Sequence, residues 1–281
     1  MSVSPRSPFP TPAPRTVSRP VSRASVVARL RAAGCVFAED EAALLFAEAG
    51  DDPAGLAALV ARRAAGEPLE HVLGWAEFRG HRVRVGPGVF VPRRRTEFLA
   101  ERAERAARRA PSPALVVDLC CGSGAVGVAL LAALDRVELH AADLDPRAVA
   151  CARRNLGAAA GVYRGDLYRP LPGRLRGRVD VLVANAPYVP SEEVALLPTE
   201  ARVHEPALAL DGGADGLGVL RRLVAGAGGW LAPGGALLVE SSERQRPALI
   251  AELTAAGLRP TVAHCAEREA TVLIGHRPVP A

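Results

Sequence analysis

The stretch "ALVVDLCCGSGAVG", residues 114–127, decides the fold. It begins with an apolar run that is rich in β-branched residues and has the length of a buried strand. Gly122 and Gly124 then mark a tight turn, and the apolar segment that follows, "GAVGVALLAAL" (124–134), indicates a helix. A strand, a glycine turn and a helix make the first half of a βαβ unit, so this stretch predicts a parallel sheet.

The same alternation continues toward the carboxyl end. Further strand-like runs are "RVELHAAD" (136–143), "VDVLVAN" (179–185) and "GGALLVES" (234–241). Helix-like runs between and after them are "PRAVACARRNLG" (146–157), "DGLGVLRRLVAGAGGWL" (215–231) and "QRPALIAELTAAG" (245–257). Alternating strands and helices predict an α/β fold with a mostly parallel sheet and helices on both faces.

The amino-terminal part has a different organisation. Residues 1–22 contain Pro, Ser, Thr and Arg with few large apolar residues, so we expect a disordered tail. Three short helix-like segments follow and end at Gly34, Gly50 and Gly66, which predicts a small helical domain over residues 23–75. "EFRGHRVRVGPGVFVP" (77–92) is typical of a β-hairpin, and we expect a hairpin linker at 76–95 before the α/β domain at 96–281.

Composition and charge argue against a membrane-spanning, a secreted and a nucleic-acid-binding protein. Hydrophobic residues at 49% and charged residues at 23% fit a globular protein, and no apolar run approaches the roughly 18 residues of a membrane span. Residues 1–23 have no apolar segment of a secretory signal, so we expect a cytoplasmic protein. The net charge of +5 comes from five arginines in the first 30 positions, which leaves 30 basic against 30 acidic residues, and direct nucleic-acid binding is not expected. The five cysteines lack zinc spacing, and we predict no metal.

Acidic residues follow successive strands and suit a nucleoside. Asp118 ends the first strand beside the glycine turn, whose backbone a ligand can approach closely. Asp143 ends the second strand, where a carboxylate can accept hydrogen bonds from both ribose hydroxyls. Asp145 precedes Pro146 and is better placed to cap the next helix. Asp166, after the third strand, suits the exocyclic amine of an adenine, although it could equally be a turn residue.

Several motifs together resemble one family. "NAPY" (185–188) resembles the Asn-Pro-Pro-Tyr signature of class I methyltransferases that use S-adenosyl-L-methionine (AdoMet). "GEPLEHVLGWAEFRGHRVRVGPGVFVPRRRTEFL" (66–99), "HEPALALDGGADGL" (204–217) and "GGALLVESSERQ" (234–245) resemble the HemK/PrmC family, the protein-glutamine N5-methyltransferases of peptide-chain release factors. The resemblance implies a Rossmann-like domain with a seven-stranded sheet, a substrate-recognising helical domain, AdoMet as cofactor and a release factor as partner of a monomeric enzyme. The residues that would bind AdoMet are Asp118, Cys120, Cys121, Gly122, Ser123, Gly124, Asp143, Leu144, Asp166, Leu167 and Asn185.

The resemblance also implies how the acceptor nitrogen is held. An amide nitrogen is a poor nucleophile, and two acceptors can fix its hydrogens so that it faces the methyl group. These acceptors would be the Asn185 side-chain oxygen and the carbonyl of Ala186, with Pro187 shaping the turn and Tyr188 packing on the substrate amide. Ala186 replaces the first proline of the signature, but only its carbonyl is needed.

Arg94 and Arg95 replace the proline and acid of the family pattern and change the charge beside the expected substrate entrance. A small metabolite is therefore an alternative acceptor, as is an exocyclic amine of a nucleic acid. A binding module without activity is a further alternative.

Overall fold

The computed structural model describes residues 22–280, and the expected tail at 1–21 lies outside this range. The chain divides into two compact units, Met1–Ala64 and Ala65–Ala281. The helical unit was expected to reach residue 75, but α4 (Leu69–Leu73) belongs to the second unit. The reason is local, because Gly74 ends α4 in a left-handed conformation and the chain enters β1 (Trp75–Phe78) directly.

The first unit is made of three helices, as the glycine spacing predicted. They are α1 (Arg23–Ala32), α2 (Ala38–Ala49) and α3 (Pro53–Ala64). The hydroxyl of Ser22 accepts a hydrogen bond from the Ser25 N–H and caps α1. Arg63 on α3 binds the carboxylate of Glu41 on α2 through Nε and Nη2, at 2.6 and 3.1 Å. A bidentate ion pair therefore joins two helices in the interior of this unit.

In the second unit, α4 is followed by a β-hairpin. β1 pairs antiparallel with β2 (His81–Arg84) across a turn at Arg79 and Gly80. The segment after β2 is held by His71 of α4, whose Nε2 lies 2.8 Å from the carbonyl oxygen of Val89. Burial lowers the pKa of His71, so the ring is neutral at pH 7 and donates this hydrogen bond.

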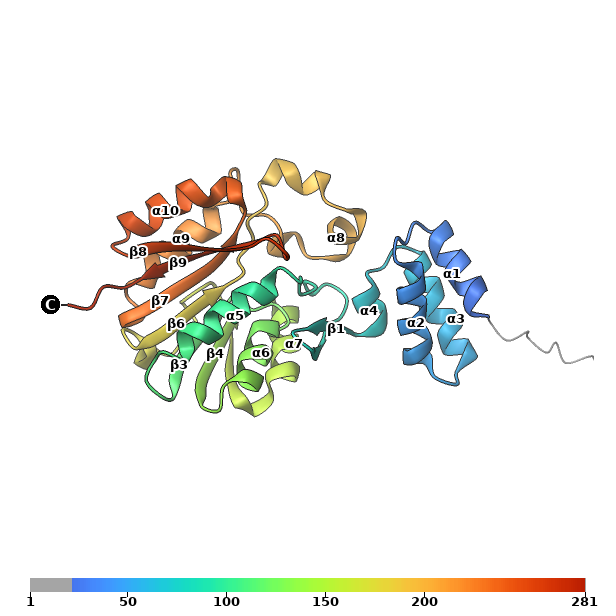
Figure 1. The fold of residues 1–281 in the computed structure, drawn as a ribbon, viewed down its shortest axis with the longest axis horizontal. Coiled ribbons are helices and arrows are strands. Elements are labelled where there is room, and N and C mark those ends of the chain that lie inside the picture. The colour runs from blue at the N-terminus through green and yellow to red at the C-terminus, as the bar shows by residue number, and fades with distance from the viewer. Residues whose placement is uncertain (1–21, 281) are drawn as a thin grey trace, which may run out of the picture. The chain divides into compact units, whose positions relative to one another are not determined.

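A seven-stranded sheet forms the core of the second unit and confirms the predicted fold class (Figure 1). The strands are β3 (Ala114–Leu119), β4 (Val137–Asp143), β5 (Ala160–Arg164), β6 (Val179–Ala184), β7 (Leu231–Ser241), β8 (Arg259–Cys265) and β9 (Ala270–His276). Their order is β5-β4-β3-β6-β7-β9-β8. Only β9 runs antiparallel to its neighbours β7 and β8.

Helices cover both faces of this sheet (Figure 1). One face packs against α5 (Thr96–Ala107), α6 (Ala125–Ala133) and α7 (Pro146–Leu156), and the other against α9 (Gly218–Ala227) and α10 (Arg246–Ala255). Side chains alternate between the two cores, so that Val116 joins the first and Val117 the second. The near-continuous apolar strands follow from burial on both sides.

The strand order reverses between β3 and β6, which are neighbours although β4 and β5 lie between them in sequence. Leu119 pairs with Ala184, so both strands end at the same level. Ligands of open α/β sheets bind at such a switch point.

The chain after β6 forms an irregular excursion that the sequence pattern did not predict: the short helices η3 (Ser191–Leu196), α8 (Thr199–His204) and η4 (Ala207–Ala209). Within residues 22–280, no helix combines the length and apolar character that a bilayer crossing demands.

Candidate active site

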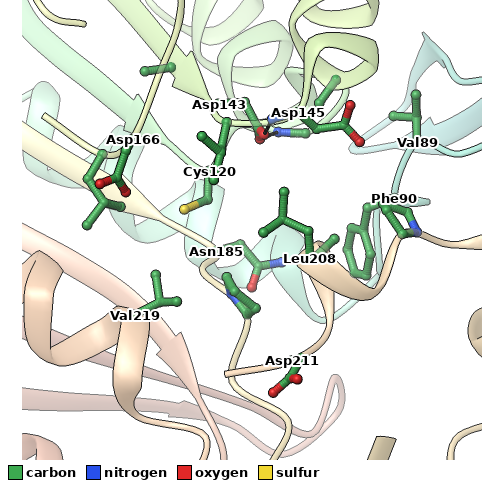
Figure 2. Close-up of a pocket in the computed structure, with 18 of the residues that line it drawn as sticks. Val89, Phe90, Cys120, Asp143, Asp145, Asp166, Asn185, Leu208, Asp211 and Val219 are labelled. Carbon is green, nitrogen blue, oxygen red and sulfur yellow. Dashed lines mark hydrogen bonds between the residues drawn. The ribbon is translucent and has the colours of Figure 1, made fainter. Parts of the chain in front are cut away.

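A cavity of about 880 Å3, counted out to its open mouth, lies at the carboxyl ends of the central strands (Figure 2). The predicted site residues that line it are Cys120, Gly122, Asp143, Leu144, Asp166, Leu167, Asn185 and Pro187. Every lining residue belongs to the second unit.

The glycine turn after β3 forms the base of this cavity. Gly122 and Gly124 have φ of +55° and +80°, the left-handed region that favours glycine. A Cβ on Gly124 would also lie 3.3 Å from the Cα of Ala152 in α7, so a side chain there would be crowded as well as strained. Gly124 is the N-cap of α6, and the glycines thus let the strand turn sharply into the helix.

Asp143 lies where the second strand meets this turn. Its Oδ2 accepts a hydrogen bond from the Gly122 N–H and its Oδ1 one from the Asp145 N–H, both at 2.9 Å. Burial raises the pKa of Asp143, and the two backbone hydrogen bonds act in the opposite direction. Each carboxylate oxygen has a second acceptor position, which leaves capacity for a ligand in the cavity.

Asp145 caps α7, as predicted. Its Oδ1 accepts a hydrogen bond from the Arg147 N–H at 2.8 Å, and Pro146 occupies the first turn of the helix. Asp145 also lines the cavity beside Asp143 (Figure 2).

Asp166 faces the cavity from beyond β5 and has a partner that the sequence did not reveal. Nη2 of Arg222, on α9, donates a hydrogen bond to Asp166 Oδ2. Arg222 also lines the cavity. Nothing in the local pattern of "DGLGVLRRLV" marks this arginine, because the two side chains meet only through the fold.

Four residues of the predicted cofactor set are not part of the lining: Asp118, Cys121, Ser123 and Gly124. The side chain of Asp118 is completely buried, and its Oδ2 has no hydrogen-bond partner within residues 22–280. Burial, reinforced by the charge of Asp143, raises the pKa of Asp118 to about 8. With a pKa of about 8, the buried Asp118 carboxyl keeps its proton at neutral pH.

A second cavity, of about 1,000 Å3, adjoins the first. The two share four lining residues: Phe90, Asn185, Pro187 and Ala209. Asn185, which follows β6, is one of these shared residues, and it lies at the first cavity (Figure 2). Two ligands bound in the two cavities would therefore meet at the Asn185 side chain.

The "NAPY" turn lines the second cavity with all four of its residues. The Asn185 Nδ2 donates a hydrogen bond to Thr96 Oγ1 at 3.1 Å. The Tyr188 hydroxyl donates one to Glu240 Oε1 at 3.0 Å. Burial and the adjacent Glu240 carboxylate raise the pKa of Tyr188, so the phenol stays neutral.

The carbonyl groups of this turn are held by the "DGGADGL" and "SSERQ" segments. The Gln245 Nε2 donates to the carbonyl oxygen of Tyr188 at 2.8 Å. Gly216, at φ +74°, lies so close to the same carbonyl that an added Cβ would be 2.3 Å from its oxygen. A Cβ on Gly212 would be 2.8 Å from the Pro187 oxygen. The three segments therefore form one closely packed support for the turn.

The loop after β2 contributes residues that the sequence analysis did not single out. Val89 and Phe90 line the first cavity (Figure 2). Glu205, which is buried, accepts hydrogen bonds from the Val91 N–H and from Arg93. Burial raises the pKa of Glu205, and the guanidinium of Arg93 opposes this. The sequence contained one signal for these hydrogen bonds: Glu205 and the loop after β2 both lie in motifs that resemble the same family.

Among residues 22–280, no group of three or more His, Cys, Asp or Glu side chains is arranged so that it could hold a metal ion.

Comparison with known proteins identifies relatives of this chain. The family model "Methyltransferase small domain" matches residues 82–215. The release factor glutamine methyltransferase of Geobacter sulfurreducens is 43% identical over 185 residues, which are 65% of this chain and 63% of that protein. That of Mycolicibacterium smegmatis is 42% identical over 209 residues, 73% of each chain. A 4-amino-L-phenylalanine/4-methylamino-L-phenylalanine methyltransferase of Streptomyces pristinaespiralis is 39% identical over 203 residues, 70% of this chain and 69% of that protein.

Solved structures share the fold. A methyltransferase from Pyrococcus furiosus superposes with a TM-score of 0.51 at 15% identity, covering 72% of this chain and 91% of that chain. A T. thermophilus 16S rRNA methyltransferase in complex with AdoMet and guanosine gives a TM-score of 0.50 at 22% identity, covering 72% of this chain and 49% of that chain.

The strand order and the site at its switch point define a class I methyltransferase fold. Within this class, the chain belongs to the release factor glutamine methyltransferase family. Matched residues cover somewhat less than two thirds of the Geobacter relative, at 63% of its length. The expectation drawn from the motifs is thereby confirmed at the level of the family.

Proposed function

We propose that this chain transfers a methyl group from AdoMet to the side-chain nitrogen of a glutamine, in the Gly-Gly-Gln loop of a peptide-chain release factor. The observation that carries the proposal is the meeting of two cavities at Asn185. The first would hold the methyl donor and the second the acceptor. The names of several relatives, release factor glutamine methyltransferase, support this choice of substrate.

The lining of the first cavity fits AdoMet. It contains four aspartates, Asp143, Asp145, Asp166 and Asp211, against a single arginine, and this acidic balance suits a cationic sulfonium. Asp143 would accept hydrogen bonds from the ribose hydroxyls, and Asp166 one from the adenine amine. Bound AdoMet supplies an activated methyl group, so this chain has only to orient the nucleophile.

The acceptor nitrogen would be oriented by two oxygens at the end of β6. The Asn185 Oδ1 and the carbonyl of Ala186 would each accept one N–H hydrogen of the substrate amide. The nitrogen lone pair would then face the first cavity, and the ring of Tyr188 would pack against the flat amide. The arrangement supplies its catalytic effect through position and needs no strong base before the transfer.

The test uses the full chain with isotopically labelled AdoMet and a purified bacterial release factor. We expect label in the factor, located by mass spectrometry on the glutamine of its Gly-Gly-Gln loop. A release factor with Gln replaced by Glu in that loop is the matched control and should stay unlabelled. Label in the control factor, or none in either, would contradict the proposed substrate.

A second candidate acceptor has support of its own. The Streptomyces pristinaespiralis relative is named for an amine of a modified phenylalanine. Arg95 lines the second cavity, where its guanidinium lies beside Tyr188 and Glu240. An amino acid with an aromatic amine could therefore place its carboxylate near Arg95. Adding 4-amino-L-phenylalanine in place of the release factor separates the two candidates, because label would then enter the small molecule.

The proposal also covers the location of the protein, its oligomeric state and how it recognises the substrate. We propose a cytoplasmic monomer in which the first unit recognises the protein substrate. Direct nucleic-acid binding is not part of the proposal, since basic and acidic residues balance after the first 30 positions.

A further inference from the structure

Thr96 connects the Asn185 side chain to a buried carboxylate. Thr96 is the first residue of α5 and is only 4% exposed. Glu240 lies in β7, the neighbour of β6 in the sheet, and is 1% exposed. Neither Thr96 nor Glu240 was singled out by the sequence motifs. Thr96 meets Asn185, and Glu240 meets Tyr188, because α5, β6 and β7 pack together at this edge of the site.

Two hydrogen bonds hold these side chains in pairs, Asn185 with Thr96 and Tyr188 with Glu240. The Asn185 Nδ2 donates to Thr96 Oγ1 at 3.1 Å. The Tyr188 hydroxyl donates to Glu240 Oε1 at 3.0 Å. Burial raises the pKa of Glu240, while hydrogen bonds from Thr96 and Tyr188 and the nearby guanidinium groups favour its ionised form. The Tyr188 hydroxyl therefore donates to Glu240, and the Thr96 hydroxyl lies beside the same carboxylate.

The Asn185–Thr96 hydrogen bond can run in only one direction when Glu240 is ionised and accepts the Thr96 hydrogen. An ionised carboxylate only accepts hydrogen bonds, and a hydroxyl has a single hydrogen to give. If Thr96 gives its hydrogen to Glu240, its oxygen can only accept from Asn185. The amide nitrogen is the only donor on the Asn185 side chain, so it must face Thr96. The amide oxygen is then left for the boundary of the two cavities.

We propose that Thr96 and Glu240 are positioning residues that hold the Asn185 amide with its oxygen toward the acceptor nitrogen. The amide NH2 and oxygen have nearly the same shape, so packing alone would not choose between the two orientations. The inverted orientation would present N–H groups to a substrate N–H and prevent the alignment. The proposal rests on the methyltransfer function proposed above.

Glu240 lowers the stability of the fold, which supports a role for it in the site. Its Oε2 has no hydrogen-bond partner within the described residues, although the side chain is buried. A buried carboxylate with an unsatisfied oxygen destabilises a fold relative to a neutral side chain of similar size. The position therefore serves a purpose that an apolar residue would not fulfil.

Two substitutions at Thr96 separate positioning from packing. Thr96→Val keeps the shape but removes the hydroxyl, whereas Thr96→Ser keeps the hydroxyl and serves as the conservative rescue. We expect Thr96→Val to lower kcat by at least about tenfold and to leave the KM for AdoMet within about threefold. Thr96→Ser should recover most of the lost kcat. Glu240→Gln should resemble Thr96→Val, because its amide can donate as well as accept and no longer fixes the direction.

Asparagine NMR tests the same idea without any acceptor. Asn155 and Asn185 are the only asparagines in the chain, so isotope-labelled asparagine gives two side-chain amide signals. The Asn155 Nδ2 donates to carbonyl oxygens of Arg84 and Ser123 and serves as an internal control. In Thr96→Val, solvent exchange of the Asn185 amide should accelerate at least about tenfold. It should stay near the wild-type rate in Thr96→Ser, and the Asn155 signals should not change.

The two readouts distinguish failure of this inference from failure of the proposed function. An Asn185 amide signal that is the same in wild type and Thr96→Val would overturn the inference, whatever the enzyme methylates. So would a Thr96→Val enzyme with wild-type kcat. If wild type left the release factor unlabelled while the Asn185 signal responded as expected, the positioning would be upheld and the proposed substrate would be wrong.

Discussion

Asp143 and Asp145 are neighbouring carboxylates that lie beside the same cavity, yet their hydrogen bonds assign them different tasks. Asp143 organises the glycine turn, whereas Asp145 caps α7. We expect Asp143→Ala to weaken AdoMet binding by about tenfold to a hundredfold, since charge-assisted hydrogen bonds contribute roughly 1.5–3 kcal/mol. Asp145→Ala should lower stability by about 1 kcal/mol through the lost cap and change the affinity less. Calorimetry that ranked the two affinities in the opposite order would contradict this assignment.

Asp118 predicts a pH dependence of stability. Its pKa is about 8 in the folded protein against an ordinary value of 3.8, so folding takes up a proton between these values. The contribution of Asp118 to stability is therefore complete at low pH and decreases by about 1.4 kcal/mol per unit as the pH rises through this window. Asp118→Asn cannot titrate. Urea titrations from pH 5 to pH 8 should show its stability declining less steeply than that of wild type, and parallel profiles would contradict the buried, protonated carboxyl.

At the scale of elements, the loop before α9 supports the end of β6. Gly213 and Gly216 both have φ in the left-handed region, at +92° and +74°. A Cβ on Gly213 meets nothing closer than 3.9 Å, whereas one on Gly216 would overlap the Tyr188 carbonyl. Gly213→Ala should therefore cost only about 1 kcal/mol from backbone strain, and Gly216→Ala clearly more, with a loss of turnover. Equal melting temperatures and equal turnover for the two variants would show that the Tyr188 carbonyl can move.

Individual strands and helix caps can be predicted from the sequence. The strands around Val116 and Val181 and the cap at Asp145 are local patterns of a few consecutive residues, and the structure confirms them. The excursion at residues 191–209 has no recognisable periodicity because its helices are only three to six residues long.

Some residues of the site can be predicted from local sequence patterns and others cannot. Residues next to strand ends, such as Asp143 and Asn185, could be found from the sequence. Partners that meet them only in three dimensions, such as Thr96 and Arg222, could not, because no local pattern records a contact between residues that are far apart in the chain.

At the scale of the whole molecule, the two units have separable tasks in this account. All residues of the two cavities belong to Ala65–Ala281, as do both large apolar cores of the sheet. A fragment that begins at Ala65 should therefore fold and bind AdoMet within about threefold of the full chain. It should methylate a release factor more slowly if the first unit recognises the protein. A fragment that folded but did not bind AdoMet would contradict the assignment of the cofactor site to the second unit.

The central claim is that the end of β6 holds the reacting nitrogen. Single-turnover methyl transfer by Asn185→Ala, with the acceptor that wild type uses, tests it most directly. We expect the rate to fall by at least about a hundredfold, the scale of losing one positioned polar contact in a transition state. The AdoMet affinity should stay within about threefold and the melting temperature close to that of wild type. An unchanged single-turnover rate would contradict the claim and reduce "NAPY" to a structural turn.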